Sequence, residues 1–268
     1  MVRNRTSNLA AYECWLRGAK HHEQETPGAL AEARRCYEAA LALDPNFGRA
    51  HAGLAEIAYM ETVFASWGTN DAENFEQAYL RATKAVEIDP TDARPHYVLA
   101  MILMARHEWD AARQHWDLSA GLDANDADVA MCRATALAYL GYPDEAFATA
   151  QLAMKLNPHF PNWYISDLGV IRFAQRKYRE CLDCYAQILD LYPHSPAWRA
   201  AAAAYLGLDS EASHHAASFL GNAEKAWAGD AAAGPKEYVA WLIKHIPLRL
   251  QADRDHLIEG LRKAGLPA

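Results

Sequence analysis

One closely spaced cysteine pair has the residue types for redox or metal chemistry. Cys181 and Cys184 form a C-x-x-C sequence within "ECLDCY". A thioredoxin-like pair lies at the start of a helix that follows a strand, where the thiol pKa is lowered. This pair instead falls in the middle of a predicted helix, and a zinc site would require two further ligands. We therefore interpret both cysteines as packing residues.

The twelve histidines are numerous but scattered along the chain. The sequences "KHH" and "SHH" each place two histidines side by side, and adjacent residues on a helix point in different directions. His107 and His115 fall in the turn and second helix of one segment, and no H-E-x-x-H or comparable spacing occurs. We expect structural or solvent-exposed histidines and no metal site.

The motifs of common catalytic sites are missing from the sequence. It has no G-x-S-x-G, no phosphate-binding glycine loop and no carboxylate pair in an evident cleft. The basic "GLRKAG" near the end is typical of a helix with cations at its C-terminus. The sequence therefore predicts a protein that is not an enzyme and has no cofactor.

Composition narrows the class of partner. The 268 residues are 51% hydrophobic and 22% charged, as in ordinary globular proteins, and the net charge of -8 disfavours nucleic-acid binding. No apolar run approaches the ~20 residues that span a bilayer. The start, "MVRNRTSNLAAYECWL", lacks the apolar segment of a signal peptide. The five cysteines suggest no disulfide framework, so we expect a cytoplasmic protein without a membrane partner.

Apolar runs that end in a turn recur along the chain, as in "LALDPNF", "VEIDPTD", "AGLDAND", "MKLNPHF" and "LDLYPHS". The equivalent positions are Pro45, Pro90, Ala124, Pro158 and Pro193, with spacings of 45, 34, 34 and 35 residues. A period of 34 is that of the tetratricopeptide repeat (TPR), which has two antiparallel helices per unit. Proline suits the turn because it cannot continue the preceding helix.

Fixed positions within each unit alternate small and large residues. Gly169 and Cys181 stand beside Tyr185 in one unit, and Ala112 and Ser119 stand beside Trp116 in another. Small residues let two helices approach, and the hairpins must stack because none could bury its apolar face alone. The predicted fold is all-α: a right-handed TPR superhelical solenoid of about five to six helical hairpins.

The long spacing after Pro45 indicates an insertion around "YMETVFASWGTNDAENF". We interpret it as an extended first helix followed by a loop near Gly68 to Asp71. Phe64, Ser66 and Trp67 would then project past the regular wall, at a position where insertions often bind. The alternative is that Phe64 and Trp67 pack on a neighbouring hairpin.

The pattern weakens after Pro193. We expect the TPR array to occupy residues 1–220 and C-terminal capping helices to occupy 221–268, because the last unit of a solenoid has one face without a neighbour. The segment "GNAEKAWAGDAAAGPKE" looks like a loop. The segments "KEYVAWLIKHIP" and "DRDHLIEGLRKAGLP" look like two short amphipathic helices.

Three phrases carry a family resemblance: "NLAAYECWLRG", "LNPHFPNWY" and the terminal "GLRKAGLP". With them, the chain from about Asn8 to its end resembles the C-terminal TPR region of bacterial class III adenylate/guanylate cyclases. Related regulators carry a winged-helix or TolB-like domain before a similar array. The resemblance implies the fold and an effector domain in front of it. The residues before Asn8 are too few for such a domain, so either a fragment or a stand-alone array is expected.

Helical phase predicts which residues line the concave groove that TPR arrays use for peptides. The predicted groove residues are Arg49, Tyr59, Arg94, Tyr97, Met101, Met104, Met131 and Tyr139. The Lys and Asn that grip a terminal carboxylate in the chaperone-tail-binding branch are absent from this set. Met and Tyr suit an adaptable apolar contact, and each Arg could hold a carboxylate. The alternative is that several of these residues pack between hairpins.

The leading hypothesis is a non-enzymatic protein–protein interaction module that binds a peptide or protein segment in the groove, amphipathic with acidic flanks. The alternative is a regulatory or sensor region of a nucleotide cyclase or transcription regulator that responds to a small molecule. A homodimer is left open, because terminal hairpins of repeat arrays often pair.

Overall fold

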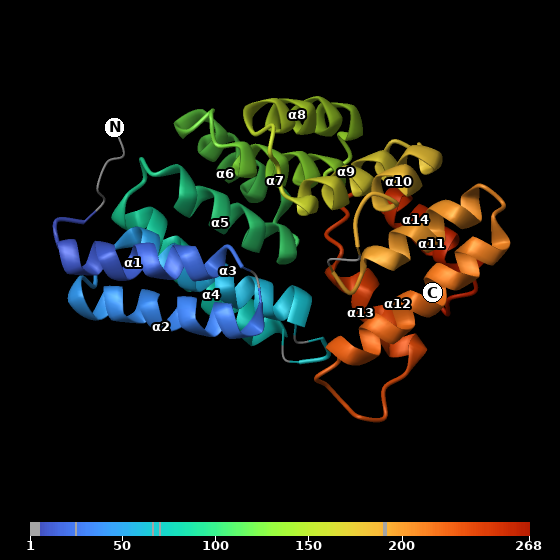
Figure 1. Ribbon diagram of the computed structural model, residues 1–268, viewed down its shortest axis with the longest axis horizontal. Coiled ribbons are helices and arrows are strands. Elements are labelled where there is room, and N and C mark those ends of the chain that lie inside the picture. Colours follow the sequence, from blue (N-terminus) through green and yellow to red (C-terminus); the bar gives the residue numbers. More distant parts are fainter. Residues whose placement is uncertain (1–5, 25, 66, 70, 190–191) are drawn as a thin grey trace. The chain divides into compact units, whose positions relative to one another are not determined.

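The computed structural model describes residues 6–24, 26–65, 67–69, 71–189 and 192–268. The chain forms two compact units, each described by itself below. Unit 1 comprises residues 1–65 and 70–123, and unit 2 comprises residues 66–69 and 124–268. Helices make up both units (Figure 1), which confirms the predicted all-α class.

Unit 1 consists of three antiparallel hairpins. They are α1 (Leu9–His22) with α2 (Pro27–Leu43), α3 (Gly48–Met60) with α4 (Asp71–Ile88), and α5 (Ala93–Ala105) with α6 (Trp109–Leu122). Side chains of Asn8, Thr26 and Asp92 cap the starts of α1, α2 and α5 by accepting backbone N–H groups. The first helices α3 and α5 lie against each other, as successive TPR units require.

Tyr37 of α2 shows why small residues occupy the fixed positions. Its ring lies between α1 and α3, and both helices present a glycine to it. A Cβ on Gly18 would lie 2.6 Å from the ring, and one on Gly53 would lie 2.5 Å from it. Alanine at either position would therefore push the helices apart.

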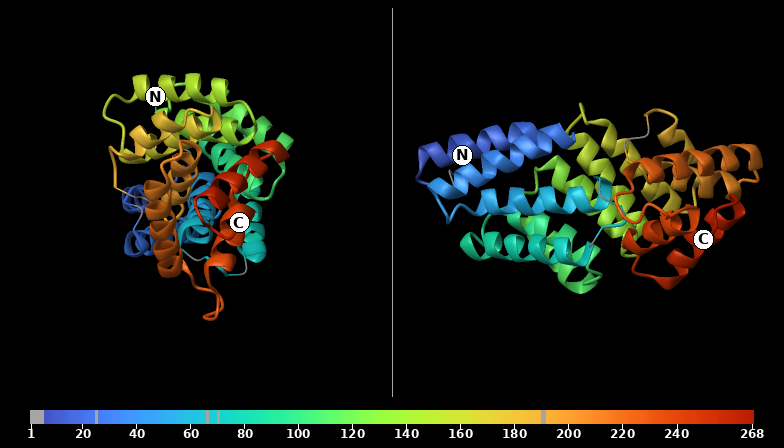
Figure 2. Two further views of the ribbon diagram at one scale, coloured as in Figure 1. Left: turned by 90° about the vertical axis from the view of Figure 1, so that its right-hand side faces the viewer. Right: turned by 90° about the horizontal axis from the view of Figure 1, so that it is seen from below.

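Unit 2 continues with three hairpins and a cap. The hairpins are α7 (Ala127–Tyr139) with α8 (Pro143–Leu156), α9 (Asn162–Ala174) with α10 (Tyr178–Tyr185), and α11 (Ser195–Tyr205) with α12 (Asp209–Ala226). The cap helices are α13 (Pro235–His245) and α14 (Gln251–Lys263), and α14 packs on α11 (Figure 2). The predicted boundary at residue 220 falls inside α12, so the stretch from 221 to 226 is helical rather than a loop.

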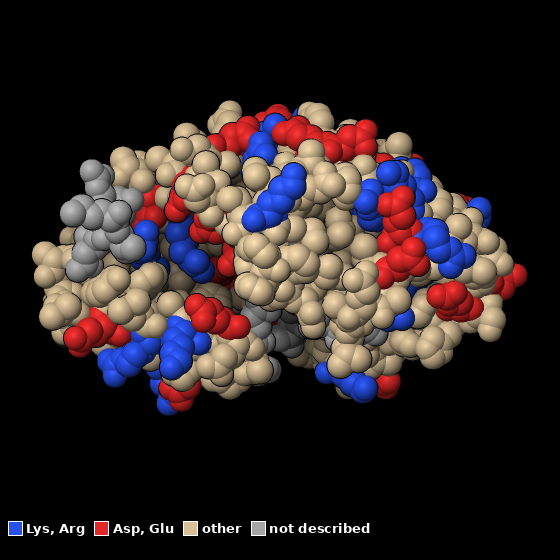
Figure 3. Space-filling model, turned by 45° about the horizontal axis from the view of Figure 1, so that its top comes forward, with Lys and Arg blue, Asp and Glu red and all other residues tan. Residues whose placement is uncertain are grey.

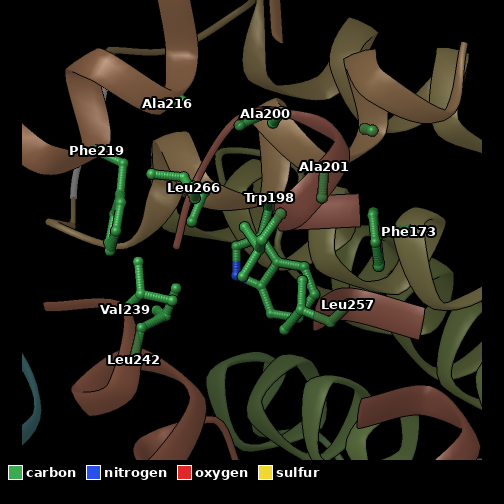
Figure 4. Close-up of a cluster of buried hydrophobic side chains, with 14 of the residues drawn as sticks. Phe173, Trp198, Ala200, Ala201, Ala216, Phe219, Val239, Leu242, Leu257 and Leu266 are labelled. Carbon is green, nitrogen blue, oxygen red and sulfur yellow. The ribbon is translucent and has the colours of Figure 1, made fainter. Parts of the chain in front are cut away.

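One apolar cluster of unit 2 surrounds Trp198. Figure 4 shows Trp198 with Phe173 and Leu257 on one side and Val239 and Leu266 on the other. Helices α9, α11, α13 and α14 therefore share one apolar cluster. The cap belongs to the folded unit because it covers α11 with its own leucines.

Helix α10 ends earlier than the repeat pattern predicts. It stops at Tyr185, although the equivalent turn comes at Pro193. The backbone N–H of Gln187 donates to Cys184 O at 3.1 Å, and its side-chain Nε2 donates to Asp183 O at 2.9 Å. In a continued helix the Asp183 carbonyl would accept from the backbone N–H of Gln187. Here it accepts from the Gln187 side chain instead, which favours the early end of α10.

The insertion after α3 matches its predicted form in part. Helix α3 is extended by a π-helical turn, η1 (Glu61–Ala65), as expected for a lengthened first helix. Trp67 does not project: it is buried in unit 2, its ring 6.2 Å from Phe219, and its backbone pairs with residues 226 and 228. Trp67 therefore packs, as the alternative states, but against α12 of unit 2 and not on the next hairpin of the repeat. Ser66 and the side chain of Phe64 lie outside the described residues.

Candidate functional site

The predicted groove residues divide between the two units. Six of them come from α3 and α5 of unit 1, and two come from α7 of unit 2. The unit 1 residues are Arg49, Tyr59, Arg94, Tyr97, Met101 and Met104. The candidate site is therefore built on α3 and α5, called the inner helices of unit 1 below.

Burial separates these residues into two groups. Arg49, Tyr59, Tyr97 and Met101 are half-buried, whereas Met104 is buried. In unit 2, Met131 has no exposed surface and lies in a core cluster with residues of α8 and α9. A fully buried Met131 offers nothing to a ligand, so packing between hairpins accounts for it. The half-buried Tyr139 stacks on Trp198, with ring centroids 6.4 Å apart.

Arg49 is already paired with a carboxylate of the next hairpin. Its Nε donates to Asp92 Oδ2 at 2.6 Å and its Nη2 donates to Asp92 Oδ1 at 3.2 Å. The guanidinium also lies 5.5 Å from the ring centroid of Trp15 in α1. This two-point ion pair joins the inner helices and leaves Arg49 largely occupied.

Arg94 has a different environment. Its Nη2 donates to Glu56 Oε2 at 2.8 Å, and Tyr97 Oη donates to Glu56 Oε1 at 2.8 Å. The Glu56 side chain is only 8% exposed, yet Arg94 keeps 43% exposure. Arg94 is therefore both anchored and accessible.

The charges of this pair stabilise each other. Burial would raise the pKa of Glu56, but Arg94, His22 and the Tyr97 hydroxyl together lower it below the usual value. The Glu56 carboxylate in turn raises the pKa of Arg94. Glu56 is consequently ionised, and removal of Arg94 would leave the buried Glu56 carboxylate without its cation.

A histidine from the first hairpin extends this network. His22 Nδ1 lies 3.3 Å from Tyr37 Oη, and His22 Nε2 lies 3.3 Å from Met60 Sδ. Burial lowers the pKa of His22, so the ring is neutral near pH 7. Sequence reasoning missed the contacts of His22 with Tyr37 and of Asp92 with Arg49, because each joins residues of two different helices. An acidic residue near the start of the next first helix is the signal that could have found Asp92.

On the face drawn in Figure 3, basic and acidic side chains meet inside a recess at the left of the view. Tyr97 adds an apolar wall, its ring at 5.7 Å from Trp116 and 5.8 Å from the Arg94 guanidinium carbon. This combination can hold an anionic group next to an apolar one.

The C-x-x-C pair lies in α10, where both cysteines are buried. Burial raises the pKa of Cys181, and it raises that of Cys184 to about 11. Both are protonated thiols near pH 7, which confirms their interpretation as packing residues. Among the described residues, no three His, Cys, Asp or Glu side chains gather in a way that could hold a metal ion. No described helix is both long and apolar enough to cross a membrane.

No protein-family model matches this chain. A stretch of 102 residues, 38% of the chain, is 30% identical to a Rhizobium meliloti protein named "Putative adenylate cyclase 3". The match spans 17% of that protein's length, so the chain corresponds to a small part of it. This likeness agrees loosely with the resemblance to cyclase TPR regions.

Solved structures resemble the chain more extensively. The Cut9–Hcn1 hetero-tetramer of APC/C has a TM-score of 0.60 at 18% identity, covering 79% of this chain and 40% of that one. A thermophilic TPR protein of Thermus thermophilus has a TM-score of 0.54 at 19% identity, covering 74% and 99%. Pseudomonas aeruginosa pilF has a TM-score of 0.52 at 17% identity, covering 78% and 89%. These likenesses show that the chain has an all-α TPR fold.

Proposed function

We propose that the chain is a non-enzymatic interaction module that binds a peptide or protein segment on the inner helices of unit 1. The observation that carries this proposal is the state of Arg94. Its guanidinium is fixed by Glu56, it keeps 43% of its side chain exposed, and Tyr97 and Met101 stand half-buried on the same helix. A fixed, accessible cation beside apolar side chains suits a segment with one acidic and one apolar residue.

The ion pairs narrow the ligand that was expected from sequence. Asp92 accepts from two nitrogens of Arg49, whereas Glu56 accepts from one nitrogen of Arg94. Arg49 is 21% exposed and uses two nitrogens for Asp92, so a ligand carboxylate would have to displace that residue. One acidic contact, at Arg94, is therefore proposed in place of two.

Assembly with another protein is a property of at least one structural neighbour, since Cut9 was solved in a hetero-tetramer with Hcn1. We extend that property to this chain because stacked helical hairpins present a large ordered surface.

All five cysteines are free thiols, which supports the proposed location in the reducing cytoplasm.

The test is a pull-down from native cytoplasm with the chain as bait, followed by mass spectrometry of the bound proteins. The variant is Tyr97→Ser with Met101→Ser, both half-buried on α5. The matched control is Leu118→Ser with Leu122→Ser, two exposed positions on α6 of the same unit. A protein that is retained by the wild type and the control but lost from the α5 variant supports the proposal. Equal retention by all three baits contradicts it.

The likeness to the Rhizobium meliloti protein favours a second candidate function. In that case the chain is a regulatory or sensor region of a nucleotide cyclase or transcription regulator and responds to a small molecule. Native mass spectrometry of the freshly purified chain tests it. A stoichiometric small molecule that survives buffer exchange, with no enriched protein in the pull-down, would favour the sensor function over peptide binding.

A further inference from the structure

The outward side of α1 carries a row of four exposed residues. Leu9, Glu13, Leu16 and Lys20 follow one another at intervals of four, three and four residues, so they share one face of the helix. We call these four residues the α1 stripe. Leu9 is 65% exposed and Leu16 is 45% exposed, so the stripe places two apolar side chains in solvent.

The opposite face of α1 is buried. Ala11, Cys14, Gly18 and His22 are buried against the rest of unit 1. The α1 stripe is thus a second apolar surface, and α1 is the first helix of its unit. Leu43, 47% exposed, ends α2 close to the start of α1, since its backbone carbonyl accepts from Asn8 Nδ2 at 3.0 Å.

The order of charges along the α1 stripe indicates its occupant. Glu13 precedes Leu16 by three residues and Lys20 follows it by four. If two copies of α1 cross antiparallel with Leu16 near a twofold axis, Glu13 of each copy faces Lys20 of the other. A parallel arrangement would instead set like charges together. The stripe is therefore complementary to itself in the antiparallel arrangement, as an isologous interface requires.

The neighbouring charge does not disturb this arrangement. Arg17 lies at the edge of the stripe, and its Nη2 is 3.2 Å from Cys14 Sγ on the same helix. The guanidinium is therefore directed along its own helix. We propose that a second copy of this chain docks on the α1 stripe, with the two Leu16 side chains at the twofold axis and one Glu13–Lys20 pair on either side of them.

The pairing is expected to be weak and concentration-dependent. One helix pair with Leu43 at its edge lies at or below the ~1,200 Å² of a small specific interface. Rim charges then select the partner and its direction more than they add affinity. This proposal is independent of the proposed peptide site, because none of its residues lies on α3 or α5.

Sedimentation equilibrium over a concentration series tests the proposal with two charge-reversal variants, Glu13→Lys and Lys20→Glu. The wild type should dimerise, and each variant alone should dissociate about tenfold more readily, because each opposes like charges twice. An equimolar mixture of the two variants should dimerise again, since each Lys then faces a Glu. Circular dichroism of all chains checks that these exposed substitutions leave the fold unchanged.

The mixture makes the result independent of folding defects, since two misfolded chains would not restore each other. Leu16→Ser should abolish pairing in every combination. A wild type that stays monomeric throughout the series would overturn the proposal. A dimer that persists in both variants, or a mixture that fails to regain it, would equally place the contact on another surface.

Discussion

Two pairs of neighbouring first helices occupy equivalent positions in the repeat but are joined by different chemistry. In unit 1, α3 and α5 are joined by the ion pairs Arg49–Asp92 and Arg94–Glu56. In unit 2, α7 and α9 are joined by hydroxyl groups that donate to carboxylates. Thr135 Oγ1 donates to Asp167 Oδ2 at 2.8 Å, and Tyr164 Oη donates to Asp128 Oδ1 at 2.6 Å.

The difference shows that the repeat fixes helix positions and leaves the contact chemistry free. Of these two pairs, the first presents a cation together with a half-buried tyrosine and methionine. The second pair presents acids and buries its methionine in the core. Binding is therefore proposed for unit 1, although both pairs have the same place in the repeat.

The largest effect is expected at the methionines of the two pairs. Met131→Ser should destabilise the protein by about 3 kcal/mol, since it removes a fully buried side chain and buries a hydroxyl. Met101→Ser should cost under about 1 kcal/mol, because Met101 is half-buried. Urea denaturation of both variants measures the contrast. Similar losses would mean that Met101 is also a core residue.

The next effect concerns the carboxylates. Glu56→Gln should destabilise by about 2 kcal/mol, because the buried carboxylate loses the charge-assisted hydrogen bonds that it accepts from Arg94 and Tyr97. Asp128→Asn in unit 2 should cost no more than about 1 kcal/mol, since Asp128 is exposed and an amide oxygen still accepts from Tyr164. Thermal unfolding of the two variants side by side gives the difference. An equal cost would remove the distinction between the two pairs.

Acid should destabilise both units, because burial lowers the pKa of His22 in unit 1 as it does that of His256 in unit 2. In unit 2, burial lowers the pKa of His256 to about 4, with its Nε2 2.8 Å from Tyr178 Oη and its ring stacked on Tyr205. A histidine whose pKa is lower in the folded state stabilises the fold above its unfolded pKa of ~6.5, and this stability is lost as the pH falls toward 4. The pKa of Glu56 is lowered from 4.5, so its contribution is lost only below that pH.

The variant His256→Gln isolates this contribution. The stability that the wild type loses between pH 6.5 and 4 should be smaller in the variant, because the remaining histidines titrate in both chains. Thermal unfolding at half-unit pH steps measures it, and direct titration of the His256 ring by NMR gives its pKa. A ring that titrates near its ordinary value of 6.5 would contradict the packed environment described for it.

The repeat made much of the fold predictable from sequence. Turn sequences at spacings of mostly 34 or 35 residues, four of the five with proline, predicted the turns, and small residues at fixed positions predicted the packed faces. The early end of α10 was not predictable, because it depends on one side-chain contact of Gln187 with a backbone carbonyl. The burial of Trp67 was only one of two alternatives, because its partners in unit 2, such as Phe219, lie far along the chain.

The candidate site was predictable only in part. Helical phase correctly placed Arg94, Tyr97 and Met101 on one helix. Phase alone does not distinguish a residue that lines a groove from one that packs between two hairpins. Met131 has the phase of a groove residue and yet lies in the core, because α8 and α9 close over it. Ion pairs such as Arg49–Asp92 depend on how neighbouring hairpins align, which one sequence does not specify.

The central claim is that ligand binding belongs to the inner helices of unit 1. Hydrogen–deuterium exchange of the chain, with and without the protein captured in the pull-down, tests it most directly. Backbone amides in α3 and α5 should exchange more slowly on binding, and those in α7 and α9 should exchange at an unchanged rate. Protection confined to α7 and α9, with none in α3 and α5, would contradict it.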